Sequence, residues 1–449
     1  NARAAVIPEL CVSCGECVKV CPAEAKKIRS DLSRAQHLIQ SGAKVYASVA
    51  PSYVGYFKGI SIGKLAGALK RLGFTGVSET GAQLVSSQTA ELLRKAGPGV
   101  YFSSACPASV DFIRKYYPQW TESILPVVSP VMAHCKLLKQ MYGNDIKTIF
   151  IGPCAAKKNE ADRNPDDLSL AITFAALESW LKSAGVTWES VEETELIPSP
   201  AEEGRLYSLE GGMNETLRAP EVDARLVAVS GLPNIARMIE KVNMEDIKKS
   251  STKLFVEMLA CDGGCVNGPV MEKGSSRVDV MLETASHAPR RTSVGRDVPV
   301  DIQQYVYPDR QELPEPEEAA IKQALEKIGK FSAEDELNCD GCGYDTCRNF
   351  AQALLAGRAE PSMCVSYLKK QAQKKANALL RSISSAVVIT DKKLQIIECN
   401  RNFAALFGED TLEAFDACPG LAGADLKRIV PFAGLFASSL QSGHDVRRD

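Results

Sequence analysis

The stretch E-M-L-A-C-D-G-G-C-V-N-G at residues 257–268 contains two cysteines, Cys261 and Cys265, with two glycines between them. A largely apolar run at residues 254–260 leads into the first cysteine. A short apolar run of this kind predicts a buried strand that ends in a loop. Glycines let the backbone turn tightly, so both sulfurs can face one object. A pair of buried core thiols is the alternative explanation for this stretch taken alone.

Two other largely apolar runs end in a cysteine in the same way. Residues 101–105 lead into Cys106, and residues 148–153 lead into Cys154. In an open α/β sheet, ligands bind at the carboxyl ends of the strands. We therefore expect all four cysteines to converge on one site, where four thiolates suit either an iron–sulfur cluster or zinc.

The three segments resemble, in order, the three cluster-binding motifs of [FeFe]-hydrogenases, which are T-S-C-C-P, P-C-x-x-K-x-x-E and A-C-x-G-G-C-x-x-G. In this chain they are S-S-A-C-P at residues 103–107, P-C-A-A-K-K-N-E at residues 153–160 and A-C-D-G-G-C-V-N-G at residues 260–268. The resemblance extends over residues 44–300 and includes the segments 50–52, 211–215 and 231–234.

This resemblance implies an α/β hydrogenase catalytic domain with its cluster ligands at strand ends. In the family, four cysteines hold a [4Fe–4S] cubane, and the last of them bridges to a two-iron subsite. That subsite carries CO, cyanide and a bridging dithiolate amine, and the two parts together form the H-cluster. The ligands implied here are Cys106, Cys154, Cys261 and Cys265, with Cys265 as the bridge.

The resemblance also implies which side chains hold the two-iron unit. The Lys157 ammonium offers three donors and a positive charge to one cyanide. The backbone and hydroxyl at Pro51 and Ser52 suit the other cyanide, and Pro153 belongs to the same pocket. The alternative for Lys157 is a solvated surface lysine, although it follows a buried strand end by only three residues. Lys157 and Glu160 together argue against an iron–sulfur scaffold without the two-iron unit, because a [4Fe–4S] cubane alone needs neither residue.

Departures from the motifs predict slow hydrogen turnover with retained hydrogen binding. In the family, a second thiol before the first ligand relays protons, but here that position is Ala105, whose methyl group cannot exchange a proton. The helix that would supply relay carboxylates has V-S-S-Q at residues 85–88. Leu259 replaces a common methionine, and Asp262 stands where proline is common. Asp262 is a candidate proton carrier in place of the thiol.

The N-terminal cysteines follow the C-x2-C-x2-C-x3-C-P spacing of bacterial ferredoxins. They are Cys11, Cys14, Cys17 and Cys21. The spacing predicts a [4Fe–4S] cluster, with zinc as the alternative. Because the fourth cysteine of such a run ligates the other cluster in two-cluster ferredoxins, we expect an N-terminal piece to be missing and Cys21 to serve a cluster outside this chain. Residues 1–43 are thus predicted to be an incomplete, ferredoxin-like α+β segment.

Residues 44–304 are predicted to form the H-cluster domain around one largely parallel sheet. Strands are expected at residues 44–50, 101–104, 148–151 and 226–229, and helices at residues 60–72 and after Pro107 and Pro130. Within the helix after Pro130, we interpret Cys135 as a core thiol and His134 as a partly exposed imidazole, in preference to a fifth metal site.

Residues 305–320 contain prolines and acidic residues without an apolar period, which predicts a linker. Residues 321–366 resemble the small four-cysteine domain of corrinoid iron–sulfur proteins. Its predicted ligands are Cys339, Cys342, Cys347 and Cys364. A [4Fe–4S] cluster is the expected occupant of this small Fe–S domain, and zinc is the alternative.

A polar, lysine-bearing helix at residues 367–382 is expected to connect this domain to the C-terminal segment, its lysines forming a solvated face. Residues 383–449 contain two short β runs, a polar turn and a helix, and they resemble the opening of a PAS sensor domain. A PAS fold needs about 100 residues, so we expect an incomplete, α+β PAS-like segment.

The composition restricts partners and compartment. The chain has 449 residues, 15 cysteines and a formal net charge of −2. This charge gives no general attraction to nucleic acid, and no apolar run approaches the roughly 20 residues of a membrane span. Clustered cysteines without a signal peptide predict a metal-binding protein of an anaerobic cytoplasm rather than a disulfide framework.

The sequence therefore predicts a hydrogen sensor that slowly and reversibly oxidises H2 and relays a redox signal through Fe–S clusters to a PAS-linked output. The alternative is an electron-transferring catalytic hydrogenase that feeds a redox partner, and an iron–sulfur scaffold without the two-iron unit is a third class. The expected partners are H2 and protons, a redox partner or downstream signalling protein, and further copies of the chain in a homo-oligomer.

Overall fold

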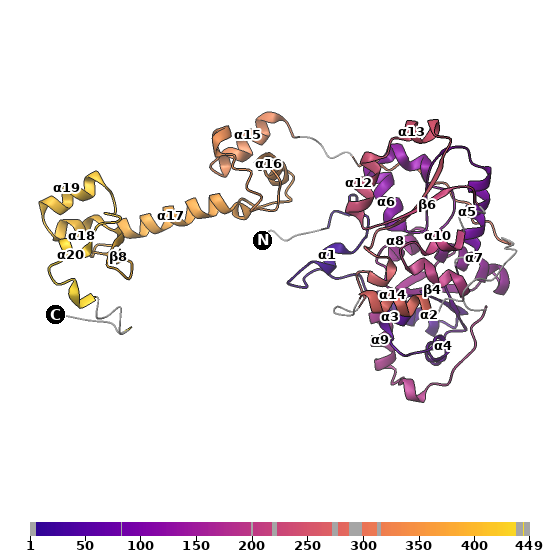
Figure 1. Ribbon diagram of the computed structural model, residues 1–449. Coiled ribbons are helices and arrows are strands. Elements are labelled where there is room, and N and C mark those ends of the chain that lie inside the picture. Colours follow the sequence, from indigo (N-terminus) through magenta and orange to yellow (C-terminus); the bar gives the residue numbers. More distant parts are fainter. Residues whose placement is uncertain are drawn as a thin grey trace. The chain divides into compact units, whose positions relative to one another are not determined.

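The computed structural model describes residues 6–81, 83–198, 201–217, 222–271, 277–286, 299–311, 316–436 and 443. The chain divides into two compact units, of which the larger spans Val6–Glu312 and the other includes Leu313–Asp449 (Figure 1). None of the described helices is long and apolar enough to cross a lipid bilayer.

Two parallel sheets form the centre of the larger unit. The first has the order β2 (Gly76–Glu79), β1 (Val45–Val49), β4 (Lys147–Gly152) and β5 (Leu170–Thr173). The second has the order β3 (Gly99–Phe102), β7 (Lys253–Leu259) and β6 (Arg225–Ser230). Every pair within them is parallel. The predicted parallel strands are confirmed, but the prediction of one sheet is wrong, because β3 pairs with the distant β7 rather than with β1 or β4.

Helices pack around both sheets and begin where the sequence provides caps. Ser61 Oγ accepts from Lys64 N at 3.1 Å before α4 (Ile62–Arg71), and Ser129 Oγ accepts from Met132 N at 3.4 Å before α7 (Pro130–Tyr142). The other main helices are α5 (Gln83–Lys95), α6 (Pro107–Tyr116), α8 (Ala156–Arg163), α9 (Phe174–Ser183), α10 (Gly212–Leu217), α12 (Leu232–Lys241) and α14 (Arg277–Ser286). The predicted helices after Pro107 and Pro130 are confirmed.

The N-terminal segment of the larger unit has little regular structure. It contains the one-turn helix α1 (Glu16–Lys19) and then α2 (Leu32–Gln40), and β1 is the first strand of the described chain. Residues 6–43 therefore lack the strands that the α+β prediction required, and loops connect their two helices.

The second unit contains two small cores. In the first, α15 (Glu318–Lys327) packs against α16 (Cys347–Leu355) through Leu325 and Phe350. Helix α17 (Val365–Ser382) follows, and Figure 1 shows it as one continuous helix. The second core surrounds the antiparallel pair β8 (Val388–Thr390) and β9 (Ile396–Cys399) with α18 (Arg401–Leu406), α19 (Glu409–Ala417) and α20 (Leu426–Ile429).

A buried ion pair holds the N-terminal segment on the first sheet. Lys158 Nζ donates to Asp31 Oδ2 at 2.9 Å and to the carbonyl oxygen of Ala171 at 2.7 Å, and both charged side chains are buried. Burial alone would raise the pKa of Asp31. The hydrogen bond from Lys158 and the attraction to its charge have the larger effect, so the pKa of Asp31 is lowered.

We expect Asp31→Asn to reduce the free energy of unfolding by about 3 kcal/mol, because an uncharged amide then replaces the carboxylate that neutralises the buried Lys158 ammonium. Anaerobic urea unfolding of the larger unit within the full chain measures this. Asp162→Asn is the matched control, since Asp162 pairs with Arg29 at an exposed site and should contribute less than about 1 kcal/mol. Equal losses for the two variants would contradict the role given to burial.

Candidate metal centre

The three predicted cysteine motifs meet between the two sheets. Cys106 follows β3 and Cys261 follows β7 in the second sheet, whereas Cys154 follows β4 in the first. Together with Cys265, these cysteines line one small cavity, here called the cysteine cavity. The convergence expected from strand ends therefore occurs, but across two sheets instead of along one edge.

Local backbone geometry points the third motif into this space. Gly263 and Gly264 have φ angles of 76° and 102°, which are accessible mainly to glycine. A Cβ on Gly264 would lie 2.5 Å from the carbonyl oxygen of Ser208, so the loop also approaches the backbone too closely for any side chain. In the first motif, Pro107 starts α6 directly after Cys106, which ends the loop there.

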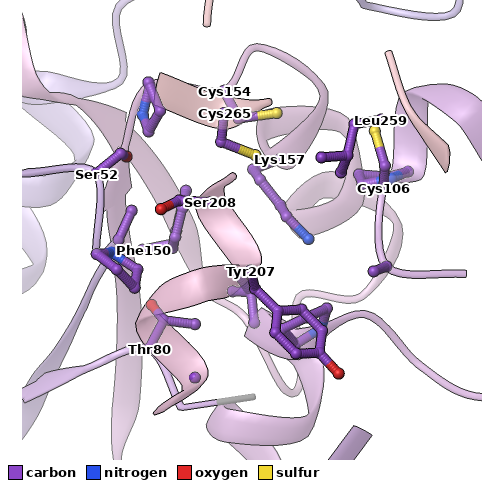
Figure 2. A pocket seen from close by; sticks show the side chains of 18 residues that line it. Ser52, Thr80, Cys106, Phe150, Cys154, Lys157, Tyr207, Ser208, Leu259 and Cys265 are labelled. Carbon is purple, nitrogen blue, oxygen red and sulfur yellow. The ribbon is translucent and has the colours of Figure 1, made fainter. Parts of the chain in front are cut away.

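A second cavity of about 90 Å³ adjoins the same cysteines, and we call it the main cavity (Figure 2). It brings together most of the residues predicted for the H-cluster, and Cys106, Cys154 and Cys265 line it as well as the cysteine cavity. The other predicted residues that line it are Pro51, Ser52, Ala105, Pro153 and Lys157. The hydroxyl of Ser52 is buried and has no hydrogen-bond partner in the described structure, so it is available to a bound group.

Lys157 is buried, with 6% of its surface exposed, so the surface alternative is wrong. Its Nζ donates to Glu160 Oε2 at 2.7 Å and to Ser129 Oγ at 2.7 Å. An ammonium has three donors, and these two bonds leave one for a ligand in the main cavity. Glu160 thus balances the charge of Lys157 without lining the cavity itself.

Burial favours the protonated form of three thiols of this centre in the absence of metal. It raises the pKa of Cys154 to about 11, and it also raises the pKa values of Cys261 and Cys265. Mutual repulsion among the cysteines adds to the effect, and Lys157 opposes it at Cys154 and Cys265. A bound metal supplies the positive charge that buried thiolates need, so binding is coupled to proton release.

Asp262 lies away from the main cavity. Its side chain is exposed, accepts from Ser230 Oγ at 3.5 Å, and lines a different hollow beside Cys14 and Cys261. No carboxylate or imidazole is among the described residues that line the main cavity. At the predicted relay helix, α5 presents Ser86, whose Oγ lies 2.6 Å from the Tyr207 hydroxyl in the cavity wall.

The N-terminal cysteine run packs directly against this centre. Lys115 Nζ donates to the carbonyl oxygens of Glu9 at 2.6 Å and Cys11 at 3.0 Å. A Cβ on Gly15 would lie 2.4 Å from Pro269, just after the third motif, so the loop fits closely there. Because Cys14 lines the cysteine cavity, the run and the four motif cysteines border one space.

The remaining predicted ligands belong to the N-terminal cysteine run and to the small Fe–S domain of the second unit. Burial raises the pKa of Cys14, and its neighbours Cys11 and Cys17 add to the shift, whereas backbone N–H groups of Ala25 and Lys26 lower the pKa of Cys21. In the second unit, Cys342, Cys347 and Cys364 pack into one apolar cluster, and Cys339 is exposed. Across the described residues, no group of three or more His, Cys, Asp or Glu side chains is arranged to hold one metal ion.

One prediction near the site is wrong. His134 is not partly exposed, because α7 packs its face against the first sheet and leaves 3% of the residue accessible. Burial lowers its pKa to about 4. Sequence reasoning also missed Thr80, Tyr207 and Ser208 in the wall of the main cavity. These residues have no motif spacing, so only the three-dimensional arrangement identifies them.

A four-thiolate centre at strand ends, beside a buried lysine and a ferredoxin-type loop, defines an iron–sulfur protein of the α/β class. The family model for the iron only hydrogenase large subunit, C-terminal domain, matches residues 43–269, about half of the chain. The chain therefore belongs to this family. A 4Fe-4S binding domain matches residues 4–27, and an Fe-S cluster domain matches residues 335–366.

Several hydrogenases are similar to the chain. Iron hydrogenase 1 of Clostridium pasteurianum is 28% identical over 330 residues, which are 59% of this chain and 57% of that protein. The NADP-reducing hydrogenase subunit HndD of Solidesulfovibrio fructosivorans is 24% identical over 329 residues, 58% of this chain and 55% of its own length. Among solved structures, a variant of [FeFe]-hydrogenase HydA1 from Chlamydomonas reinhardtii is 20% identical with a TM-score of 0.43, covering 57% of this chain and 88% of that one. The chain thus spans little more than half the length of the two relatives first named.

The residues present fit the cofactors of this family, whose members carry an H-cluster and [4Fe–4S] clusters. Four cysteines around one cavity supply the donor set of a cubane, and Cys265, like Cys106 and Cys154, lines both cavities, which a bridging ligand requires. The unpartnered Ser52 hydroxyl and the remaining donor of Lys157 suit anionic ligands of a two-iron unit in the main cavity.

We expect Cys154→Ser to lower the iron content of the reconstituted protein by about four atoms per chain, because one thiolate of the cubane is lost. Iron analysis and the visible absorption of the cluster measure this. Cys135→Ser is the control, since Cys135 is a fully buried thiol that lines neither cavity. Iron loss in the control, or full iron in Cys154→Ser, would contradict the ligand assignment.

Proposed function

We propose that this chain is a hydrogen-sensing [FeFe]-hydrogenase, which binds H2, slowly and reversibly oxidises it to two protons and two electrons, and passes a redox signal through Fe–S clusters to a PAS-linked output. The observation that carries the proposal is the wall of the main cavity. It combines ligands for the cofactor with Ala105 at the position of the relay thiol. Such a wall favours binding of H2 over rapid exchange of protons.

The cofactor, when bound, supplies the iron chemistry that cleaves H2. The chain supplies ligation, hydrogen bonds and a dry environment. Lys157 would hold an anionic ligand by charge and by its third N–H donor, while Glu160 and Ser129 fix the position of its ammonium. The buried, unpartnered hydroxyl of Ser52 would donate to a second ligand in the same cavity. Apolar neighbours such as Val131 and Phe150 exclude water and strengthen these bonds.

The location of the N-terminal cysteine run supports electron transfer from this centre. Cys14 and the four motif cysteines line the same cavity, so a cluster held by the run would neighbour the cubane. This location also favours the second candidate, a catalytic hydrogenase that feeds electrons to a redox partner. The rate of turnover distinguishes the two, because a catalytic enzyme needs a fast route for protons as well as for electrons.

The second unit provides a physical route for output. Asn400 joins the end of α17 to the PAS-like segment, because its Nδ2 donates to the carbonyl oxygens of Leu380 at 3.3 Å and Ser385 at 2.8 Å. Helix α17 itself directly follows Cys364, the last predicted ligand of the small Fe–S domain. A change in that cluster would therefore reach α17 at its first turn. We place this sensor in an anaerobic cytoplasm, acting on a downstream protein as a homo-oligomer.

Infrared spectroscopy of anaerobically matured protein, under argon and then under H2, tests the proposal. Bands from iron-bound CO and cyanide that change under H2, with slow H2 production in solution, are the expected result. The same bands with turnover as fast as that of a bulk catalytic hydrogenase would favour the second candidate. Absence of the bands, after insertion into a control hydrogenase succeeds, would leave an iron–sulfur electron carrier.

We expect Ala105→Cys to raise H2 turnover by about tenfold or more, because a positioned acid–base group contributes factors of this size or larger. Ala105→Ser is the matched control, since its hydroxyl has a similar size but is a much weaker acid than a thiol. Film electrochemistry measures the rates, and the infrared bands verify equal loading of the cofactor. If neither variant exceeds the parent chain, proton transfer at residue 105 does not limit the rate.

A further inference from the structure

Lys115, in the last turn of α6, is a buried lysine beside the N-terminal cysteine run. Only 5% of the residue is exposed. Its Nζ donates to the carbonyl oxygens of Glu9 at 2.6 Å and Cys11 at 3.0 Å, and no carboxylate is paired with it among the described residues. A buried ammonium without an anion is costly. This position therefore needs a negative charge that no described side chain supplies.

The other buried lysines of the larger unit have such a charge. Lys157 pairs with Glu160 at 2.7 Å, and Lys158 pairs with Asp31 at 2.9 Å. Of the buried lysines described in this unit, Lys115 alone has only carbonyl partners. Carbonyl dipoles satisfy the hydrogens of an ammonium, but they do not neutralise its charge.

Stabilisation of its own helix does not explain Lys115. A cation near a helix C-terminus interacts favourably with the carbonyls of the last turn. The ammonium of Lys115 instead bonds to carbonyls of another segment, at residues 9–11, which ends at the first cysteine of the run. The Tyr116 hydroxyl donates to the carbonyl oxygen of Leu10 at 2.7 Å, so two adjacent side chains of α6 hold this segment.

The cysteine run fits an anionic cluster at this place. The backbone N–H of Ser13 donates to Cys11 Sγ at 3.2 Å, a bond that favours a ligating sulfur in its charged form. Ser13 Oγ accepts from Asn159 Nδ2 at 2.5 Å, which holds the loop on α8. Four thiolates outweigh the positive charge of a [4Fe–4S] core, so such a cluster is an anion, and reduction adds a further negative charge.

We propose that Lys115 is the counter-charge of a cluster held by the N-terminal cysteine run, and that its ammonium raises the reduction potential of that cluster. The inference rests on the proposed function for the source of the electrons. Each H2 releases two electrons, which pass one at a time through the cubane, and each reduction of the N-terminal cluster takes up one. No bond forms or breaks in this transfer, and Lys115 keeps its three hydrogens.

The orientation of α6 explains why a cation is needed at this end. Its first residue, Pro107, directly follows the predicted cubane ligand Cys106, whereas its last turn contacts the cysteine run. A helix carries partial positive charge at its N-terminus and partial negative charge at its C-terminus. The dipole of α6 therefore favours an electron at the cubane, and Lys115 offsets that preference. Electrons can then leave the cubane, as transfer of a redox signal requires.

The charged side chains within the run fit this role less well. Glu16 and Lys19 are both exposed. Water and salt screen exposed charges strongly and buried charges much less. Lys115 is therefore the described charge beside the run that acts on a cluster with the least screening.

Redox titration of the matured full chain, followed by electron paramagnetic resonance of the reduced clusters, tests the proposal. Cys17→Ala identifies the signal of the N-terminal cluster as the one that it removes. With mediators setting the potential, we expect Lys115→Met to lower the ratio of reduced to oxidised N-terminal cluster about tenfold, which corresponds to a reduction potential about 59 mV more negative.

Matched variants separate the charge from a structural role. Tyr116→Phe removes the neighbouring bond to the same segment without a change of charge, so it should leave the potential unchanged. Lys115→Arg keeps the charge and should stay close to the parent chain. Lys115→Gln keeps an N–H donor without the charge and should reproduce the shift if Lys115→Met folds poorly. An equal shift in Tyr116→Phe would overturn the proposal.

This inference and the proposed function fail in different ways. An unshifted potential in both uncharged variants, with the clusters present, would overturn the role of Lys115 and leave the proposed function intact. Clusters of the parent chain that H2 does not reduce would overturn the proposed function, while a shift in the mediated titration would still support the charge effect. If Cys17→Ala removes no signal, the run holds no cluster and this inference is overturned.

Discussion

The convergence of three strand ends from two sheets is the constraint on which the rest of the structure depends. Cys154 comes from the first sheet, while Cys106, Cys261 and Cys265 come from the second. A cluster held by all four would cross-link the sheets covalently, in addition to the apolar contacts between them. Binding energy of the metal is then also folding energy of this interface. Loss of one cysteine ligand should therefore weaken the packing of the two sheets against each other as well as the binding of the cofactor.

Charge balance explains the polar residues around this centre. Four thiolates are costly to bury unless a cation neutralises them. An anionic two-iron unit in the main cavity would need further positive charge, and Lys157 is the basic side chain among the described residues of its wall. Glu160 pairs with that lysine at 2.7 Å without lining the cavity, so the ammonium remains paired and oriented even without a ligand. The site is thus prepared for an anion before the cofactor arrives.

The sequence predicted the local features well and the long-range pairing poorly. Apolar runs that end in Cys106, Cys154 and Cys261 identified the strands and the cysteines that line one cavity, because both signals lie within a few residues. The division into two sheets could not be predicted, since β3 and β7 have the same apolar pattern whichever strand they pair with. The burial of His134 was missed for a related reason. A single imidazole in an amphipathic helix has no local signal that serines from two strands will enclose it.

The difference between a sensor and an enzyme can rest on how protons leave one cavity. A catalytic site gains from a relay that reaches solvent, because each turnover must release a proton before the next H2 binds. A sensor gains from the opposite property, since a proton that stays beside the reduced centre prolongs the state that a partner must detect. The methyl group of Ala105 offers no such relay in the wall of the main cavity. Under the proposed function, slow turnover and a longer-lived reduced site would therefore follow from the same residue.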